Sequence, residues 1–314
     1  EKNEKSKKII LDFEIKTRFK QKYILDIITT DINRDKGNQK LIYIDKRNEF
    51  TANNFLIINT EDDQPIFHDF IDTNIRFSIK SNNGYKKLYV SHYAKRFQLP
   101  GPPFSISPIK TYSIKPDTFY KVNWTDTTTF QLVSYGLYFF QTDTSQKQGV
   151  SICHFGRYYP EVKTPESLLE PVRYLTTSRE FKEYLMFKDK KEAADNFWIK
   201  ISGNPNRARE LIRIYYTRVK YANLYFSCHT EGWRTDRGLM YLIFGPPSTI
   251  YKNDYQERWI YGSTQNMQSM SYTFRKVENP LSDNDFELNR SEIYKVTWYQ
   301  AIETWRNGRA FSIH

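Results

Sequence analysis

Apolar residues recur at every second position near the start of the chain, over residues 11–16 and again over 23–27. This period of two is typical of half-buried β-strands, whose successive side chains point to opposite faces. A turn is predicted by the Asn, Asp and Gly residues at 33–38, and residues 41–44 resume an apolar strand. At most three strands result, which is too few to close a core. We therefore interpret residues 1–48 as strands of an incomplete N-terminal β-module whose remainder is absent from this sequence.

Short apolar runs continue to about residue 155 and are separated by turn-forming clusters. The runs lie at 55–58, 75–79, 88–93, 119–122, 130–134, 137–140 and 150–155. Many short strands at this spacing favour an antiparallel β-sandwich, which we assign to residues 49–163. The segment Pro100-Gly101-Pro102-Pro103 cannot join a β-ladder, so we expect a stiff, exposed loop there.

Beyond residue 164 the apolar period lengthens to that of helices. A capping box at Thr177 and Glu180 predicts a helix that continues to Phe187, and Asp189 begins a second helix. Asn204 followed by Pro205 predicts the start of a long amphipathic helix over 205–227. Its apolar residues at helical spacing are Leu211, Ile212, Tyr215, Val219, Ala222 and Phe226.

The pattern changes again after the long helix. Residues 239–244 form an unbroken apolar run, which we interpret as a strand stopped by Gly245-Pro246-Pro247. Residues 257–261 and 271–277 predict two more strands. A final helix fits 291–306, and its one-sided apolar residues are Ile293, Val296, Tyr299 and Ile302. Residues 164–314 therefore predict an α+β domain in which helices pack on a small antiparallel sheet.

Composition and charge exclude several classes of protein. Hydrophobic residues make up 39% of the 314 positions, which excludes wholesale disorder, and no apolar run reaches the length of a membrane-spanning helix. The net charge is +11, but basic and acidic residues are interleaved along the whole chain. A nucleic-acid groove needs a concentrated basic stripe, so we expect no nucleic-acid partner. No secretory leader precedes Glu1, which leaves a cytosolic protein and a mature envelope protein both open.

One segment between the long helix and the next apolar run has a mechanical interpretation. Gly232 and Gly238 permit backbone geometries that other residues resist, and Trp233 supplies a large apolar wedge. Thr235 and Asp236 can accept hydrogen bonds from free backbone N–H groups. We therefore expect Trp233 to be buried between the long helix and the sheet, and Asp236 to accept at least one backbone hydrogen bond.

At these residues the chain resembles the GWxTD-domain proteins, which are named for the string that stands at 232–236. Further matches follow the family in order, at Phe197-Trp198, Gly245-Pro246-Pro247, Arg258-Trp259-Ile260-Tyr261, Trp298-Tyr299-Gln300-Ala301 and Trp305-Arg306-Asn307-Gly308-Arg309. The structural motif consists of Gly232, Trp233, Thr235, Asp236, Gly238, Gly245, Pro246 and Pro247. The resemblance implies a secreted protein, in Bacteroidota often a lipoprotein at the outer membrane, and it implies no agreed catalytic activity.

One group of neighbouring residues contains side chains that could carry out chemistry. No phosphate-binding loop, dinucleotide fingerprint, metalloprotease helix or nucleophile elbow is present. Cys228 and His229 could pair as nucleophile and base, and His229, Glu231 and Asp236 could ligate a metal. Adjacent residues of an extended segment point to opposite sides, so we expect Cys228 and His229 to face apart. We therefore predict no catalytic residue, no metal and no cofactor.

Two further alternatives concern cysteines and tryptophans. Cys153 and Cys228 are the only cysteines, and a disulfide between them is left open. Trp233, Trp259, Trp298 and Trp305 could form a platform for stacking sugars, but we expect them to build the core.

These observations together predict a non-catalytic cell-envelope protein with β-sandwich modules followed by an α+β module. We expect a lipid anchor, absent from this sequence, to hold it at the outer membrane on the periplasmic or surface face. Its expected partners are other envelope proteins in a multi-protein assembly for secretion, insertion or surface display. An envelope hydrolase and a carbohydrate-binding protein are the alternatives.

Overall fold

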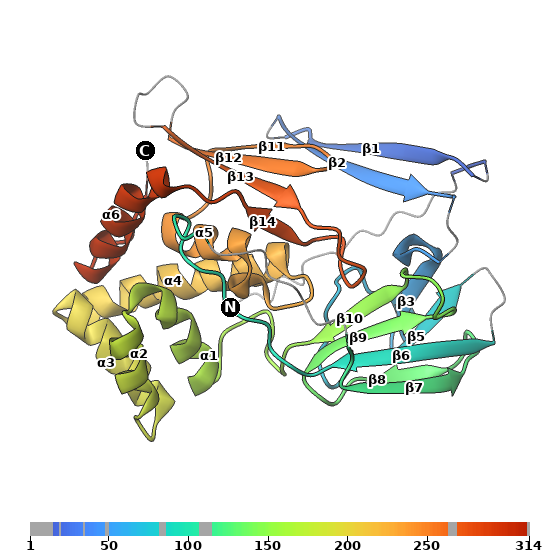
Figure 1. The fold of residues 1–314 in the computed structure, drawn as a ribbon, viewed down its shortest axis with the longest axis horizontal. Helices are drawn as coiled ribbons and strands as arrows, with labels where there is room; N and C mark the ends of the chain where they lie inside the picture. The colour runs from blue at the N-terminus through green and yellow to red at the C-terminus, as the bar shows by residue number, and fades with distance from the viewer. Residues whose placement is uncertain are drawn as a thin grey trace.

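A computed structural model describes residues 15–18, 20–33, 35–47, 50–81, 86–106, 115–262 and 269–312. Figure 1 shows a β-sandwich at one end, an α+β part at the other, and a two-stranded hairpin beside them. The mixed β and α+β fold predicted from the sequence is confirmed. In the part of the chain that the structure describes, no helix is both long enough and apolar enough to cross a bilayer.

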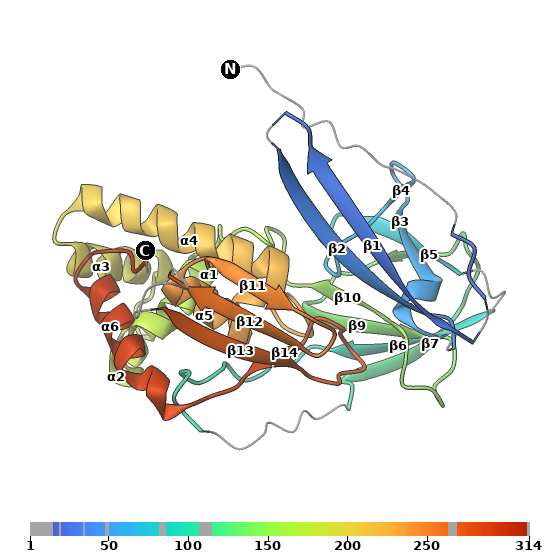
Figure 2. The same cartoon turned by 90° about the horizontal axis from the view of Figure 1, so that it is seen from above.

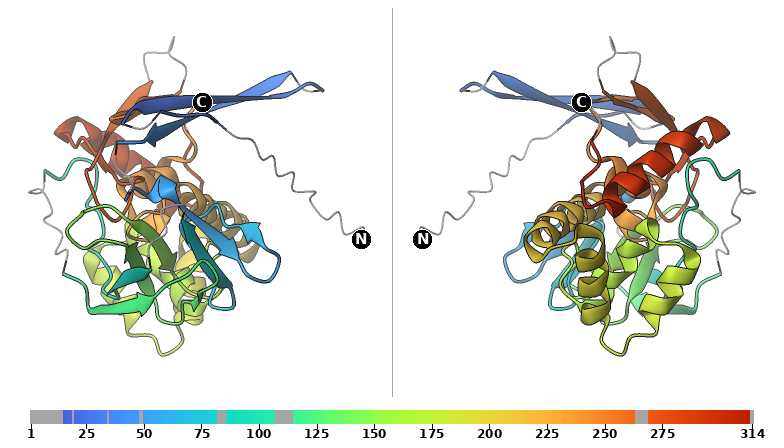
Figure 3. Two further views of the ribbon diagram at one scale, coloured as in Figure 1. Left: turned by 90° about the vertical axis from the view of Figure 1, so that its right-hand side faces the viewer. Right: turned by 90° about the vertical axis from the view of Figure 1, so that its left-hand side faces the viewer.

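The hairpin consists of β1 (Lys22–Asp31) and β2 (Lys36–Asp45), which pair antiparallel over their whole length. It forms a separate two-stranded sheet, which crosses the sandwich in the view of Figure 2 and lies along one side of the molecule in Figure 3. The strands predicted over 23–27 and 41–44 are confirmed. Residues 11–14 of the first predicted strand lie outside the described residues, and Ile15 is not in a strand.

The sandwich contains two four-stranded antiparallel sheets. The first has the order β4-β3-β5-β8, with bounds Gln64–Pro65, Phe55–Asn59, Arg76–Ser81 and Thr129–Gln131. The second has the order β10-β9-β6-β7, with bounds Val150–His154, Gly136–Gln141, Lys87–Tyr93 and Thr118–Asn123. A short 3-10 helix, Ala52–Asn54, precedes β3. Phe77 and Ile79 of the first sheet share one core with Val90 and Phe140 of the second, which confirms the predicted sandwich.

The proline-rich segment differs from the prediction of an exposed loop. Pro100 and Pro103 are buried, because residues 97–106 cross from the sandwich onto the α+β part. The segment joins no ladder, as predicted, but its carbonyl groups still find donors. The Pro103 carbonyl accepts from the Ser291 N–H at 3.1 Å, and the Gly101 carbonyl accepts from Arg290 at 3.3 Å.

The helical predictions are confirmed over 178–226. A short helix α1 (Pro165–Leu169) and a 3-10 turn Glu170–Leu175 lead into the three predicted helices, α2 (Ser178–Leu185), α3 (Lys190–Ser202) and α4 (Pro205–Phe226). Thr177 and Glu180 form the capping box, and Asp189 and Asn204 cap the next two helices with their side-chain oxygens. The buried stripe of α4 contains five of the six predicted apolar residues.

The segment after α4 contradicts one prediction. Residues 239–244 belong to the helix α5 (Asp236–Phe244), not to a strand. A short, wholly apolar run has no period that separates a buried helix from a buried strand. The sheet that follows has the order β11-β12-β13-β14, with bounds Thr249–Lys252, Gln256–Tyr261, Met270–Lys276 and Phe286–Leu288. Of these strands, β12 and β13 were predicted.

The last helix, α6 (Lys295–Arg306), follows a 3-10 turn at Glu292–Tyr294. Its buried residues are Trp298, Ala301 and Trp305, whereas the predicted stripe at Ile293, Val296 and Tyr299 is exposed. Bulky tryptophans therefore decide which face packs inward. They join one core with α4, α5 and the β11–β14 sheet.

The capping carboxylate of Glu180 makes the stability of the α+β part depend on pH. Arg306 approaches its two oxygens at 3.1 and 2.7 Å, and the Thr177 N–H donates to it at 2.8 Å. The hydrogen bonds from Arg306 lower the pKa of Glu180 to about 2, against the opposing effect of partial burial. A folded-state pKa below the unfolded one gives stability that is present above about pH 5 and is lost as the pH falls toward 2.

We therefore expect Glu180→Gln to lower the melting temperature near neutral pH and the difference from wild type to close as the pH approaches 2. Thermal melts across this pH range measure the effect. Glu183→Gln is the matched control, because its ion pair with Arg179 is exposed and should contribute little to stability. A constant difference between wild type and Glu180→Gln at every pH would contradict the assignment.

Candidate functional site

The string at 232–236 forms a short 3-10 turn, Gly232–Arg234, wedged between α4 and the start of α5. A Cβ atom on Gly232 would lie 2.0 Å from the carbonyl oxygen of Ala222, so the turn touches the backbone of α4 directly. A Cβ on Gly238 would lie 1.9 Å from the Gly232 carbonyl oxygen. The two glycines therefore let helix, turn and second helix stack backbone against backbone.

Trp233 is buried, as predicted, with 5% of its surface exposed. The backbone N–H of Trp233 donates to the side-chain oxygen of Asn223 in α4 at 3.1 Å. The indole ring meets the ring of Tyr174 edge-on at 5.8 Å, and the Tyr174 hydroxyl donates to the Trp233 carbonyl. The burial predicted for Trp233 is confirmed, but its partners lie in α4 and in the 3-10 turn Glu170–Leu175, so the ring packs between helical elements and not between the long helix and the sheet.

Thr235 and Asp236 both accept backbone hydrogen bonds, as expected. The Thr235 hydroxyl caps α5 by accepting from the Gly238 N–H at 3.0 Å, and it donates to the Gly232 carbonyl. Asp236 accepts from the Leu288 N–H of β14 at 2.8 Å. Both Asp236 oxygens also accept from the guanidinium of Arg290, at 2.9 and 2.6 Å. This carboxylate therefore fastens α5 to β14.

The three residues after α5 complete the motif. Gly245 has a φ of +84° and ends the helix, and its N–H donates to the Tyr241 carbonyl at 2.9 Å. The Tyr261 hydroxyl of β12 donates to the Gly245 carbonyl. Pro246 is exposed and Pro247 is half-buried. Proline lacks the N–H of a helical hydrogen bond, so neither residue can continue α5 toward β11.

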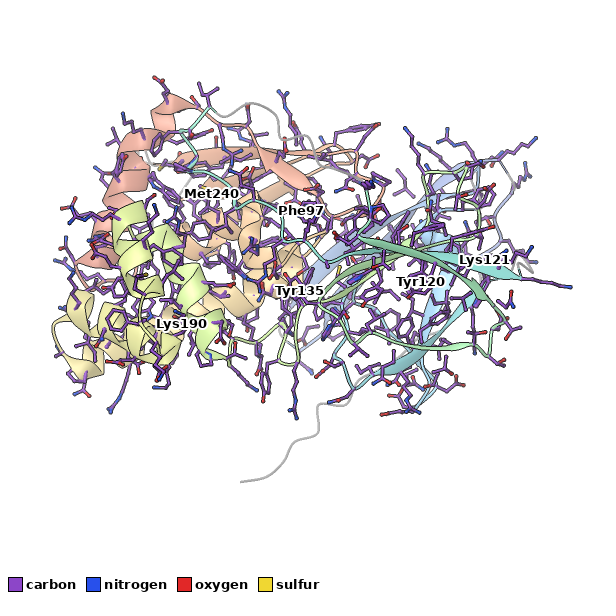
Figure 4. All side chains as sticks on the ribbon, turned by 60° about the horizontal axis from the view of Figure 1, so that its bottom comes forward. Phe97, Tyr120, Lys121, Tyr135, Lys190 and Met240 are labelled. Carbon is purple, nitrogen blue, oxygen red and sulfur yellow. The ribbon has the colours of Figure 1, made fainter. Side chains whose placement is uncertain are left out.

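Glu231 lies at the contact between the α+β part and the sandwich. Its carboxylate accepts from the Tyr135 hydroxyl at 2.6 Å and pairs with Arg234 at 3.2 Å and, more weakly, with Arg96. Burial and the Glu231 charge together raise the pKa of Tyr135. Figure 4 shows Tyr135 and Phe97 at this boundary. The alternative ligand set of His229, Glu231 and Asp236 is not brought together, because Glu231 and Asp236 are each engaged by other side chains.

His229 instead meets two other groups. The Cys228 sulfur lies 3.4 Å from its Nδ1, and the Asp285 Oδ2 lies 3.3 Å from the same nitrogen. The expectation that Cys228 and His229 face apart is wrong, because residues 228–230 form a bend and not an extended strand. Burial disfavours the charged imidazole, but Cys228 and Asp285 raise the pKa of His229 to about 10. Burial likewise opposes ionisation of Asp285, yet His229 lowers the pKa of its carboxyl.

These three residues border a pocket of about 260 Å³ between the 97–106 segment, the motif and β14. A cysteine nucleophile with an orienting carboxylate uses the two different nitrogens of the imidazole. Here thiol and carboxylate both approach Nδ1, so the arrangement is not that of a catalytic triad. What it offers is a convergence of sulfur, nitrogen and oxygen, whose ligand atoms all lie within 4.8 Å of one another.

The remaining candidates are placed as follows. Cys153 and Cys228 are free and buried, and the Cys153 thiol donates to the Cys228 carbonyl at 3.4 Å. The four tryptophans of the considered sugar platform are all buried, which confirms their assignment to the core. Sequence reasoning missed Asn223, Asp285 and Arg290. They lie 10 to 56 residues from their partners, and no spacing pattern marks them.

Comparison with known proteins agrees with the motif. The GWxTD domain family model matches residues 136–307, more than half of the chain, from β9 of the sandwich to the end of α6. No curated protein and no solved structure matches the chain. The match begins before the boundary predicted near residue 163, and the three-part division of the chain stays a prediction. From its signature string and this match, the chain belongs to the GWxTD-domain family.

Proposed function

We propose that this chain is a non-catalytic interaction subunit of a multi-protein assembly at the outer membrane, where a lipid anchor holds it. The family resemblance supports the compartment. Support for an interaction role comes from the hairpin β1–β2. Its partner is an envelope protein that adds a strand to the hairpin and covers its exposed isoleucines.

The hairpin is the observation that carries the proposal. Within the described residues its sheet has only two strands, so both outer edges of the ladder lack a neighbouring strand. One face carries Ile24 and Ile28, whose side chains are 62% and 69% exposed, together with Leu41 at 42%. The same face carries Asp26 and Gln39, whose side chains hydrogen-bond to each other. An isolated two-stranded hairpin is marginally stable in water, and an exposed edge readily accepts another strand. A partner strand would satisfy the edge and bury these residues together.

The motif supports a structural role for the rest of the family domain. The polar groups of Thr235 and Asp236 are committed to hydrogen bonds inside the molecule, and Trp233 is buried. These internal contacts account for the three side chains as structural residues, although Thr235 and Asp236 also border the 260 Å³ pocket.

Native pull-down with mass spectrometry tests the proposal. The full chain is produced with its natural leader in the bacterium that encodes it, and outer membranes are solubilised in mild detergent. We expect wild type to recover a defined partner, and Ile24→Asp with Ile28→Asp to recover at least tenfold less, because two buried carboxylates would oppose docking. Ile199→Asp, a similarly exposed position on α3, is the control and should recover the partner normally.

The possible outcomes separate the two parts of the proposal. Wild-type protein that migrates alone on a native gel would overturn the assembly role. A partner recovered equally by wild type and the hairpin variant would overturn docking at β1–β2 and would place the interface elsewhere.

A further inference from the structure

The geometry points to a divalent metal site, suited to Zn²⁺, formed by Cys228, His229 and Asp285 on the wall of the 260 Å³ pocket. All three residues are buried, with at most 5% of each exposed. This inference goes beyond the interaction role proposed above and does not depend on it.

The spacing of the ligand atoms fits one ion. Tetrahedral zinc holds sulfur at about 2.3 Å and nitrogen or oxygen at about 2.0–2.2 Å, so two ligand atoms on one ion lie roughly 3.3–3.6 Å apart. The Cys228 sulfur is 3.4 Å from His229 Nδ1, and Nδ1 is 3.3 Å from Asp285 Oδ2. Both distances match edges of such a tetrahedron. The third pair, sulfur and carboxylate oxygen, lies within 4.8 Å, so side-chain rotation has to shorten this distance by at most about 1.2–1.5 Å.

Several groups of this cluster converge on one ring nitrogen. Three groups approach His229 Nδ1, because the Asn279 amide lies 3.1 Å away in addition to Cys228 and Asp285. One ring nitrogen has either one N–H or one lone pair, so it can serve one of the three well. A cation between Cys228, His229 and Asp285 would take one lone pair from each, and its binding would release to solvent the protons of the thiol and of the imidazolium. The Asn279 amide would keep its hydrogen bond to Asp285, to which it donates at 2.9 Å.

The donor set selects the metal. A thiolate favours zinc over magnesium and calcium, and an imidazole with one carboxylate completes a set of three protein ligands. Such a set leaves a fourth position, and the pocket bordered by all three residues has room for a water molecule there.

Nearby positive charges are already paired. Arg237 is held by Glu257 at 3.1 Å, and the two pocket-lining arginines, Arg234 and Arg290, are held by Glu231 and Asp236. They therefore oppose a bound cation only weakly. The ion would join the bend after α4 to the residues before β14, a second fastening beside the one made by Asp236 and Arg290.

Metal titration of the purified full chain, with the affinity tag removed and the thiols reduced, tests the site. We expect calorimetry to show one Zn²⁺ bound per chain and the melting temperature to rise with bound metal. Co²⁺ should give the ligand-to-metal absorption of a thiolate and the visible bands of tetrahedral cobalt. Cys228→Ala should abolish the thiolate band, and His229→Gln or Asp285→Asn should weaken Zn²⁺ binding at least about tenfold.

Two control variants keep the result specific. Cys153→Ala removes the other buried thiol, and Asp283→Asn removes an exposed carboxylate two residues from Asp285. Both should bind one Zn²⁺ with wild-type affinity. Absence of the cobalt–thiolate band in the wild-type protein would overturn the proposal whether or not any variant folds. So would a Cys228→Ala protein that keeps one tight Zn²⁺.

Discussion

Gly238→Ala is expected to prevent the chain from reaching its native fold. The added Cβ would lie 1.9 Å from the Gly232 carbonyl oxygen and 2.8 Å from the Trp233 Cα. Both neighbours are backbone atoms, so no flexible side chain can move aside. The clash is relieved only if the 3-10 turn separates from α5, which breaks the Thr235 cap and displaces Trp233 from its packed position. We expect a loss of more than about 4 kcal/mol, outside the range of ordinary substitutions.

Expression, circular dichroism and urea unfolding measure this effect, and two other glycines serve as controls. A Cβ on Gly101 would make only an ordinary contact at 3.7 Å, so Gly101→Ala should be nearly neutral. Gly203 has a φ of +75° with open space around it, so Gly203→Ala should cost about 1–2 kcal/mol from backbone strain alone. Gly238→Ala protein as stable as the Gly101→Ala control would refute the proposed close packing.

The same contacts explain the composition of the family string. Gly232 is required where the turn meets α4, and Gly238 where α5 meets the turn. Between them, Thr235 begins α5 and Asp236 ties it to β14. Each residue therefore makes one contact that allows helix, turn and strand to pack at short distance. A chemical role is not needed to account for any of them.

Much of this architecture could be predicted because its signals are local. The caps at Thr177, Asp189 and Asn204 lie within three residues of the N–H groups that they satisfy. The strands of the sandwich appear in the sequence as short apolar runs between turn-forming clusters, and most of their residues are buried. The failure at 239–244 is also local in origin. The backbone hydrogen bond expected at Thr235 is in fact the N-cap of α5, and the apolar run after it has no period that identifies a helix.

The candidate metal site could not be predicted for a different reason. The alternation rule that separated Cys228 from His229 holds only for extended backbone, and the bend at 228–230 removes its premise. Asp285 reaches the pair because β12 and β13 carry the chain out and back before β14. Such proximity is a property of the folded sheet, and no spacing in the sequence encodes it.

Trp233→Ala should cost about 3–5 kcal/mol of folding free energy, the range found when a buried large aromatic side chain is removed. The hydrogen bonds of its backbone to Asn223 and Tyr174 can remain, so the loss is that of ring packing. The cavity would lie where α4, the 3-10 turn Glu170–Leu175 and α5 meet, and α4 is long and rigid, so collapse would be limited. Urea unfolding followed by circular dichroism measures the difference.

Two further variants separate ring packing from loss of any aromatic residue. Trp233→Phe keeps an aromatic edge for Tyr174 and leaves a smaller cavity, so it should be less destabilising than alanine. Tyr255→Ala removes an aromatic ring that is 78% exposed and should change stability by no more than about 0.5 kcal/mol. Trp233→Ala protein that unfolds at the same urea concentration as Tyr255→Ala would contradict the packing role of the signature tryptophan. Removal of a ring that packs between the helices must leave a cavity and lower the free energy of unfolding.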